Sequence, residues 1–255
     1  MVYAIPPSER AVLRPLFASV TYERVVCDAI LDGTLPFGEA WADHRQQPRV
    51  ALLHSHNWGF VIISGDAAAP EAPTLLRQVV AQPGWGAVWV PPGSWEDLVA
   101  ITVGEQLGAR CYHVSFHGQQ LDPDWLDHFR HSLPIGFSIK PLDLDALATL
   151  WPHVPPPLLV QRFGYGAYAA TAQVCFVVAY CTARGKVHLT LETQPAYRRK
   201  GIATAVAAQF CNEALRRQLD PYWTANVTNH ASYRLALKLG LRPEPGVHVT
   251  FGENG

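Results

Sequence analysis

Charge is scarce in this chain, and so are the patterns that define a protein's chemistry at first sight. Charged residues make up 16% of its 255 residues, and the formal net charge is −1. That balance argues against a broad surface for nucleic acid or for an anionic membrane. No apolar run approaches the roughly 20 residues that a membrane-spanning helix needs, and the N-terminus lacks the basic and apolar regions of a secretion signal. We therefore expect a cytoplasmic protein with no nucleic-acid or membrane partner.

Metal-binding patterns are equally sparse. The five cysteines form no C-x-x-C pair and are odd in number, which favours buried thiols in a reducing compartment. His54 and His56 alternate and would share one face of a strand. They are compatible with a metal-binding pair or with a polar turn through Trp58. We expect the turn, and no metal ion, because no cysteine, aspartate or glutamate cluster stands beside them in the sequence.

Two common phosphate-binding motifs are also missing. The chain contains neither G-x-x-x-x-G-K-[ST] nor G-x-G-x-x-G. Those glycine-rich turns bring backbone N–H groups to the phosphates of ATP or of a dinucleotide. Their absence removes the usual sequence argument for an ATP- or NAD-dependent protein.

What is present is an alternation of predicted strands and helices, which indicates an α/β protein. We place a domain boundary near Pro134, after the polar segment 117–134. The first part, 1–134, is predicted to have helices at 9–18, 71–82 and 94–107 and strands at 49–53, 59–64, 86–90 and 111–116. The second part, 135–255, is predicted to have strands at 135–140, 164–170, 173–182, 186–193, 222–227 and 246–251, and helices at 144–150, 201–217 and 230–239. Asp143 would cap the helix at 144–150, and Pro152 and 155–157 would end it.

Residues 195–205, PAYRRKGIATA, form the most informative segment. Arg198, Arg199 and Lys200 run directly into Gly201 at the start of a predicted helix. Adjacent cations repel one another, and a helix N-terminus already carries partial positive charge. The free N–H groups of the helix, the close approach that glycine permits and the three cations would together suit a diphosphate. The alternative is a solvated basic turn.

This segment resembles a family signature. Arg198 to Ala203 resembles the R/Q-x-x-G-x-G/A motif of the GNAT superfamily of N-acetyltransferases, in which this loop holds the pyrophosphate of acetyl-CoA. Thr193 to Arg198 resembles the V-x-P-x-[YF]-R that precedes it. Asn229 to Ser232, followed by Leu239 to Leu241, resembles the N-x-x-[AS]…lGF helix of that family. The resemblance covers 135–252 and extends to a subgroup that carries an extra N-terminal region.

The resemblance implies a fold and a cofactor. It implies a C-terminal mixed sheet flanked by helices, preceded by a smaller α/β domain, for which one hypothesis is a degenerate copy of the same fold. It also implies acetyl-CoA as cosubstrate. The residues then expected at the cofactor are Leu191, Thr193, Arg198, Arg199, Lys200, Gly201, Ile202, Ala203 and Asn229.

The catalytic residues are less well marked. Many family members have a tyrosine that protonates the leaving thiolate, and Ala236 stands at that position here. Ser232 is a candidate for this acid, or else a small residue near the helix start. Glu192 is a candidate base for a neutral amine, or else a structural partner of Arg198 or Lys200.

We expect an acyltransferase that moves an acetyl group to an amine of a small molecule or peptide by direct attack on the thioester. The alternatives are a non-catalytic acyl-CoA-binding or regulatory module and a structural protein with a solvated basic turn. We further expect 1–134 to wall the acceptor pocket. The sequence does not indicate the oligomeric state.

Overall fold

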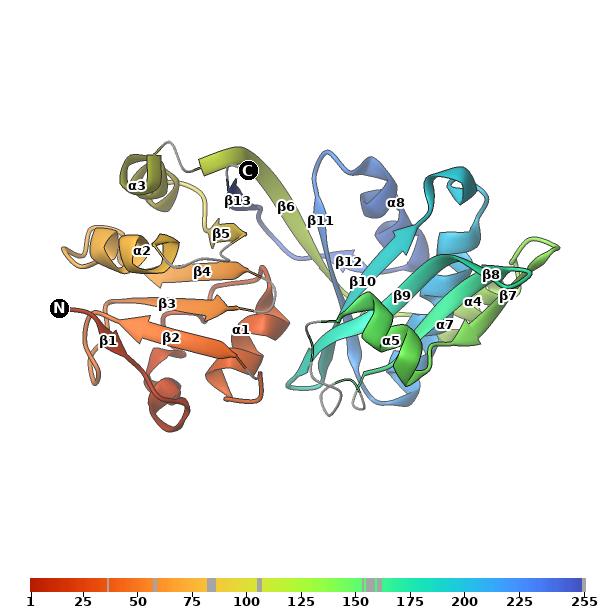
Figure 1. Cartoon of the computed structure of the whole chain (residues 1–255), viewed down its shortest axis with the longest axis horizontal. Helices are drawn as coiled ribbons and strands as arrows, with labels where there is room; N and C mark the ends of the chain where they lie inside the picture. Colours follow the sequence, from red (N-terminus) through yellow and green to blue (C-terminus); the bar gives the residue numbers. More distant parts are fainter. Residues whose placement is uncertain are drawn as a thin grey trace. The chain divides into compact units, whose positions relative to one another are not determined.

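The chain is described by a computed structural model that covers residues 1–35, 37–56, 59–81, 86–104, 107–152, 154, 159 and 162–253 (Figure 1). It divides into two compact units. Unit 1 contains Met1–Ser115, Thr224–His230 and the segment from Glu244 onward. Unit 2 contains Phe116–Trp223 and Ala231–Pro243.

Unit 1 is a mixed sheet with helices packed against it. Its strands follow the order β1-β2-β3-β4-β5-β13-β6. The elements are β1 (Tyr3–Ala4), the 3-10 helix η1 (Pro7–Leu13), α1 (Arg24–Leu31), β2 (Gly38–Ala42), β3 (Val50–Ser55), β4 (Phe60–Gly65), α2 (Ala72–Val80), β5 (Ala87–Val90), α3 (Ser94–Val103), β6 (Leu107–His117) and β13 (His248–Glu253). Its core joins apolar residues of α2 and α3 to those of β3, β4, β5 and β13.

Unit 2 contains a mixed run of strands, paired in the order β11-β10-β9-β8-β7. The elements are α4 (Pro123–Arg130), β7 (Phe137–Pro141), α5 (Leu144–Leu150), β8 (Gly164–Ala169), β9 (Ala172–Ala183), β10 (Lys186–Thr193), the 3-10 helix η3 (Pro195–Tyr197), α7 (Ile202–Arg216), β11 (Asp220–Asn226), α8 (His230–Leu239) and β12 (Arg242–Pro243). α7 is the longest apolar helix of the unit, and its buried face includes Ile202, Val206 and Phe210.

The two units repeat one topology. In unit 1, β1 to β4 pair antiparallel in succession, and β4 then pairs in parallel with β5 across α2. In unit 2, β7 to β10 pair antiparallel in succession, and β10 then pairs in parallel with β11 across α7. The expected mixed α/β fold is confirmed, and the repetition shows that the N-terminal part has the same strand order as the C-terminal part.

The division of the chain differs from the boundary expected near Pro134. α4 packs against α7, and Asn212 Nδ2 donates to Asp127 Oδ1 at 2.8 Å. The N–H of Gly118 donates to Asp220 Oδ1 at 2.7 Å. These contacts hold the segment before Pro134 to unit 2, and β13 belongs to unit 1. We expected the boundary after this segment because its sequence is polar, although α4 buries Leu126 and Phe129.

Local predictions for the elements mostly hold, with definite exceptions. Asp143 caps α5 by accepting from the N–H of Ala146 at 2.8 Å, so the helix at 144–150 is confirmed. The helix expected at 9–18 is instead a 3-10 helix over Pro7–Leu13. The helix expected at 94–107 ends at Val103, because Gly104 has φ 57°. α1, β2 and α4 were not predicted, and 155–157 and Trp58 lie outside the described residues.

Among the described residues, the helices are all too short or too polar to cross a lipid bilayer.

Candidate functional site

β10 and β11 run side by side for only part of their length. In the described residues their parallel pairing joins Lys186–His188 to Asp220–Tyr222 and stops there. A register shift between β10 and β9 follows His188 at the same point, and β10 continues to Thr193. The backbone edge of 189–193 that faces away from β9 is therefore left without a partner strand, and its N–H and C=O groups are available to a ligand.

A tight turn follows this open edge. η3 ends at Tyr197, and Arg198 then has extended backbone, with φ −67° and ψ 158°. Arg199 and Gly201 both have left-handed backbone, with φ 59° and 81°. A left-handed conformation costs an ordinary residue roughly 1–2 kcal/mol, so Arg199 holds local strain. A Cβ built on Gly201 meets nothing within 4 Å, so glycine is required there by conformation and not by crowding.

The turn leads directly into α7 and leaves its first amides available. The N–H of Ala205 donates to the carbonyl of Gly201 at 3.2 Å, which begins the helical ladder. The N–H groups before it are those that every helix leaves without an internal acceptor. Ile202 is 1% exposed and anchors the helix start in the core. Left-handed turns beside such amides make a concave anion site.

The three cations occupy different places around this turn. Arg198 Nε donates to the carbonyl oxygen of Thr193 at 3.0 Å. Lys200 Nζ lies 5.1 Å from the centre of the Tyr197 ring. Arg198, Arg199 and Lys200 are all exposed, and Ala203 is half-buried on the first turn of α7. The turn thus presents positive charge to solvent beside free backbone N–H groups, the arrangement that the sequence suggested.

The end of β10 brings three of the predicted residues together. Thr193 is buried, and its Oγ1 donates to Cys175 Sγ at 3.1 Å. Leu191 is half-buried, and Glu192 is exposed on the opposite side of the strand from Thr193. No ion pair joins Glu192 to Arg198 or Lys200 in the described part of the chain, which leaves the suggested structural role of Glu192 without a contact.

The predicted residues around α8 lie elsewhere. Ser232 is half-buried in unit 2 and accepts a hydrogen bond from Trp223 Nε1 at 2.9 Å. Ala236 is fully buried, and Gly240 ends the helix with φ 95°, as expected of a C-terminal glycine. Asn229 directly precedes α8 but belongs to unit 1, whereas the turn at 198–203 belongs to unit 2. The contact of Trp223 with Ser232 was not predicted, because residues on a strand and on the next helix show no shared pattern.

The corresponding turn of unit 1, between β4 and α2, is built differently. It carries Asp66 and Glu71 and no cation. Asp66 Oδ1 accepts from the N–H of Ala68 at 2.9 Å, and the carbonyl of Asp66 accepts from the N–H of Ala69 at 3.1 Å. This turn therefore has acidic side chains where the turn of unit 2 has cations, and one carboxylate already accepts from a backbone N–H of the turn.

Comparisons with known proteins agree with this geometry. A family model described as GNAT acetyltransferase matches residues 159–245. A solved structure of a GCN5-related N-acetyltransferase-like protein from Streptococcus suis 89/1591 is similar over 96% of this chain and 99% of its own, with a TM-score of 0.81 and 20% identity. A GCN5-related N-acetyltransferase from Sphaerobacter thermophilus is similar over 99% and 95%, with a TM-score of 0.66 and 11% identity.

A tandem GNAT protein from the clavulanic acid biosynthesis pathway is similar over 100% of this chain and 99% of its own, with a TM-score of 0.60 and 12% identity. At these identities the solved structures show the fold alone. No curated protein matches the chain. The family match covers the turn at 198–203 and the helix α8, and the fold likeness extends over both units. Residues 159–245 therefore resemble GNAT acetyltransferases in sequence, and both units share the fold of solved GNAT proteins.

Proposed function

We propose that unit 2 binds acetyl-CoA and transfers its acetyl group to an amine of a small molecule or a peptide. The observation that carries the proposal is the turn at 198–203. It combines left-handed backbone at Arg199 and Gly201, the free amides at the start of α7 and three exposed cations. A diphosphate would neutralise the cations and accept from the amides.

The open edge of β10 supports the same ligand. A pantetheine arm carries two amide groups, and an unpaired strand edge offers N–H and C=O groups to an extended chain in the way that it offers them to a peptide. The arm would run along 189–193, from the turn toward the place where β10 and β11 separate. Leu191 and Thr193 would then flank it, with the thioester beyond the last paired residues.

The proposed reaction is direct transfer. The amine nitrogen attacks the thioester carbonyl carbon, the new C–N bond forms, and the C–S bond breaks with its electron pair going to sulfur. Glu192, exposed at the end of β10, would accept the proton that the amine loses, directly or through a water. Ser232 would donate a proton to the departing thiolate, with its oxygen held by the Trp223 indole. A thiolate also leaves without an acid.

One observation favours a second candidate, a non-catalytic acyl-CoA-binding module. Ala236 is fully buried where many family members carry the tyrosine acid. A chain that kept the turn and lost the acid would bind the cofactor and transfer nothing.

A pair of measurements separates the two candidates. Thermal unfolding with and without millimolar acetyl-CoA tests binding, and we expect a gain of about 2.7 kcal/mol at 100 times Kd. Release of free thiol, followed with a panel of amines, aminoglycosides and peptides, tests transfer. Binding without thiol release from any acceptor would favour the non-catalytic module. No thermal shift would overturn both candidates.

A further inference from the structure

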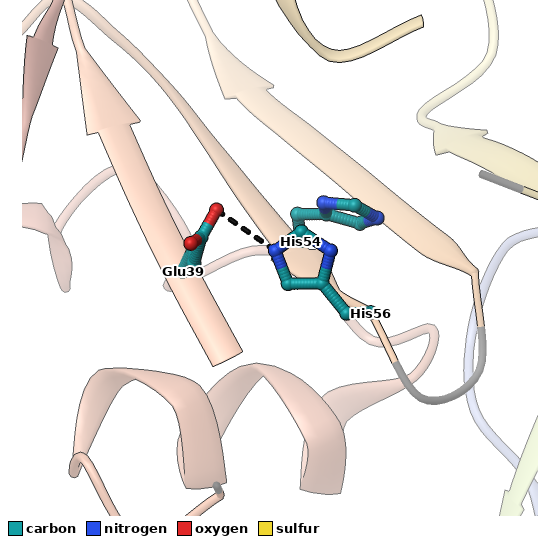
Figure 2. Close-up of side chains that lie close together, drawn as sticks. All are labelled: Glu39, His54 and His56. Atoms are coloured by element: carbon teal, nitrogen blue, oxygen red, sulfur yellow. Dashed lines mark ion pairs between the residues drawn. The ribbon is translucent and has the colours of Figure 1, made fainter. Parts of the chain in front are cut away.

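A second group of chemically active side chains lies in unit 1, far along the chain from the turn at 198–203. Glu39 on β2 is the direct cross-strand partner of His54 on β3. Side chains of paired residues, and of residues two apart, lie on the same face of a sheet. Glu39, His54 and His56 therefore share one face, and Figure 2 shows the three side chains gathered together. We expected no metal ion here, because no cysteine, aspartate or glutamate cluster stands beside the two histidines in the sequence. Glu39 instead comes from the neighbouring strand.

The distances suit a shared ligand. Glu39 Oε2 lies 2.9 Å from His56 Nε2. The rings of His54 and His56 have centroids 4.1 Å apart. One ligand atom from each of the three residues lies within 4.8 Å of the other two. Metal-bound nitrogen and oxygen atoms lie about 2.0–2.2 Å from zinc. Side-chain rotations that move each ligand atom by about 1 Å would therefore bring all three within bonding distance of one ion.

The His54 imidazole provides an independent observation in favour of a ligand at this cluster. Its side chain is fully buried, and among the described residues neither Nδ1 nor Nε2 has a hydrogen-bond partner. A buried polar group without a partner is destabilising. The ring lies against Trp41, with centroids 6.3 Å apart, and against His56. A metal ion bound to one ring nitrogen would satisfy this side chain.

We propose that Glu39, His54 and His56 form a binding site for a divalent transition-metal ion, with zinc as the expected ion. Two imidazoles and one carboxylate make a ligand set typical of zinc sites that keep a fourth position open. Imidazole ligands disfavour magnesium and calcium, which take oxygen ligands.

The site has a route to solvent. The side chains of His56 and Glu39 are 36% and 45% exposed, whereas His54 is buried. The two exposed side chains form the outer rim, and the ion would enter between them, replacing their direct contact. The fourth position would then point outward, toward water or an added ligand. This site belongs to unit 1, whereas the turn at 198–203 belongs to unit 2, so the proposal does not depend on acetyl-CoA binding by unit 2.

The test uses untagged full-length protein that has been treated with a chelator and dialysed. Zinc binding is measured by titration calorimetry, and the bound metal is counted after gel filtration. Cobalt(II) gives a second readout, because its visible absorption reports the number and geometry of its ligands. We expect one zinc per chain in this site, and cobalt bands that zinc removes.

Two exposed ligands allow variants that should fold normally. His56→Ala and Glu39→Ala should each weaken zinc binding at least ~100-fold, above the loss typical of residues that only orient a ligand. His44→Ala is the matched control, since His44 is an exposed histidine on the same β2–β3 hairpin, and it should bind zinc like the parent. Melting temperatures without metal check that each variant is folded, and His56→Gln replaces any variant that is not.

Three results would overturn the proposal. The first is a parent protein that retains no zinc and shows no binding heat at millimolar zinc. The second is equal zinc content in the parent and in both ligand variants, which would place the ion elsewhere. A loss with His44→Ala equal to the loss with His56→Ala would likewise assign the binding to a different site.

Discussion

Arg198 Nε donates to the carbonyl oxygen of Thr193 at 3.0 Å, which ties the first cation of the turn to the last residue of β10. The contact fixes the turn against the strand through atoms of the chain itself. It also directs the Arg198 side chain back toward the strand and leaves the outer positions to Arg199 and Lys200. A turn that is ordered in advance loses less entropy when an anion binds.

The backbone at Gly201 gives the sharpest test of the diphosphate site. Gly201→Asp should abolish binding of CoA, because it places a carboxylate among the amides that the phosphates need. Gly201→Asn is the matched control, since asparagine has the same shape, tolerates left-handed backbone and carries no charge. Calorimetry with CoA measures both variants, and melting temperatures show whether they fold. Equal binding by the two variants would mean that the diphosphate does not lie at this turn.

Glu192 can be tested as the base through its rate and pH profile. Glu192→Gln should lower kcat by about 10²–10⁴ and leave CoA affinity nearly unchanged. Ser232→Ala should have a smaller effect, because a thiolate leaves without an acid. Steady-state kinetics over a range of pH measure both. An unchanged acidic limb of the profile in Glu192→Gln would exclude Glu192 as the base.

The contrast between the two turns predicts one CoA per chain. Unit 2 offers free amides and cations at 198–203, whereas in unit 1 Asp66 already bonds to the N–H of Ala68. Calorimetry should therefore give a stoichiometry of one, and Asp66→Asn should not change it, because the amide oxygen still occupies the turn. A stoichiometry of two would contradict the expectation that unit 1 does not bind the cofactor.

The division of the chain into units changes what a truncated protein should do. A fragment starting at Ile135 lacks α4, which packs against α7, and it carries β13 without its partners β5 and β6. We expect this fragment to be insoluble or to unfold well below the full chain. Circular dichroism and thermal unfolding of the two proteins make the comparison. A fragment as stable as the full chain would show that these contacts contribute little.

Buried histidines predict a fall in stability at acidic pH. His248 is 2% exposed, and its Nε2 lies 3.0 Å from Ser115 Oγ. Burial, and then the neighbouring His113, lower the pKa of His248 from 6.5 to about 4, with Glu23 opposing the shift. The unfolded chain therefore binds a proton that the folded chain does not between about pH 6.5 and 4. Stability present above pH 6.5 is lost through that window, by about 3 kcal/mol at most.

The control for this prediction is His248→Gln, which keeps a polar side chain and removes the titration. Urea unfolding at several pH values between 7 and 4 gives the free energy of unfolding for both proteins. The curve of the variant should fall less steeply than that of the parent. Curves that run parallel would show that His248 does not carry the pH dependence. His54, whose pKa is also lowered to about 4 by burial, contributes equally to both proteins.

Structural features that are set by residues close together in the sequence were predicted. Features that are set by contacts between residues far apart in the sequence were missed. The strand, turn and helix around Gly201 were predicted because their whole pattern lies within one short segment. Glu39 was missed as a partner of His54 because a cross-strand pairing leaves no local signal. α4 was missed because its buried residues are few and its surroundings polar. The position of β13 was missed for the same reason as that of Glu39.

The place of β13 between β5 and β6 has a consequence for synthesis. Its six residues follow every strand of unit 2 in the sequence, yet they complete the sheet whose other strands lie in the first half of the chain. Until then β5 and β6 have exposed edges, which invite pairing with other chains. Pairings so far apart in sequence also slow folding. Most of unit 1 is therefore synthesised before unit 2, but its sheet is completed only after the strands of unit 2 have been synthesised.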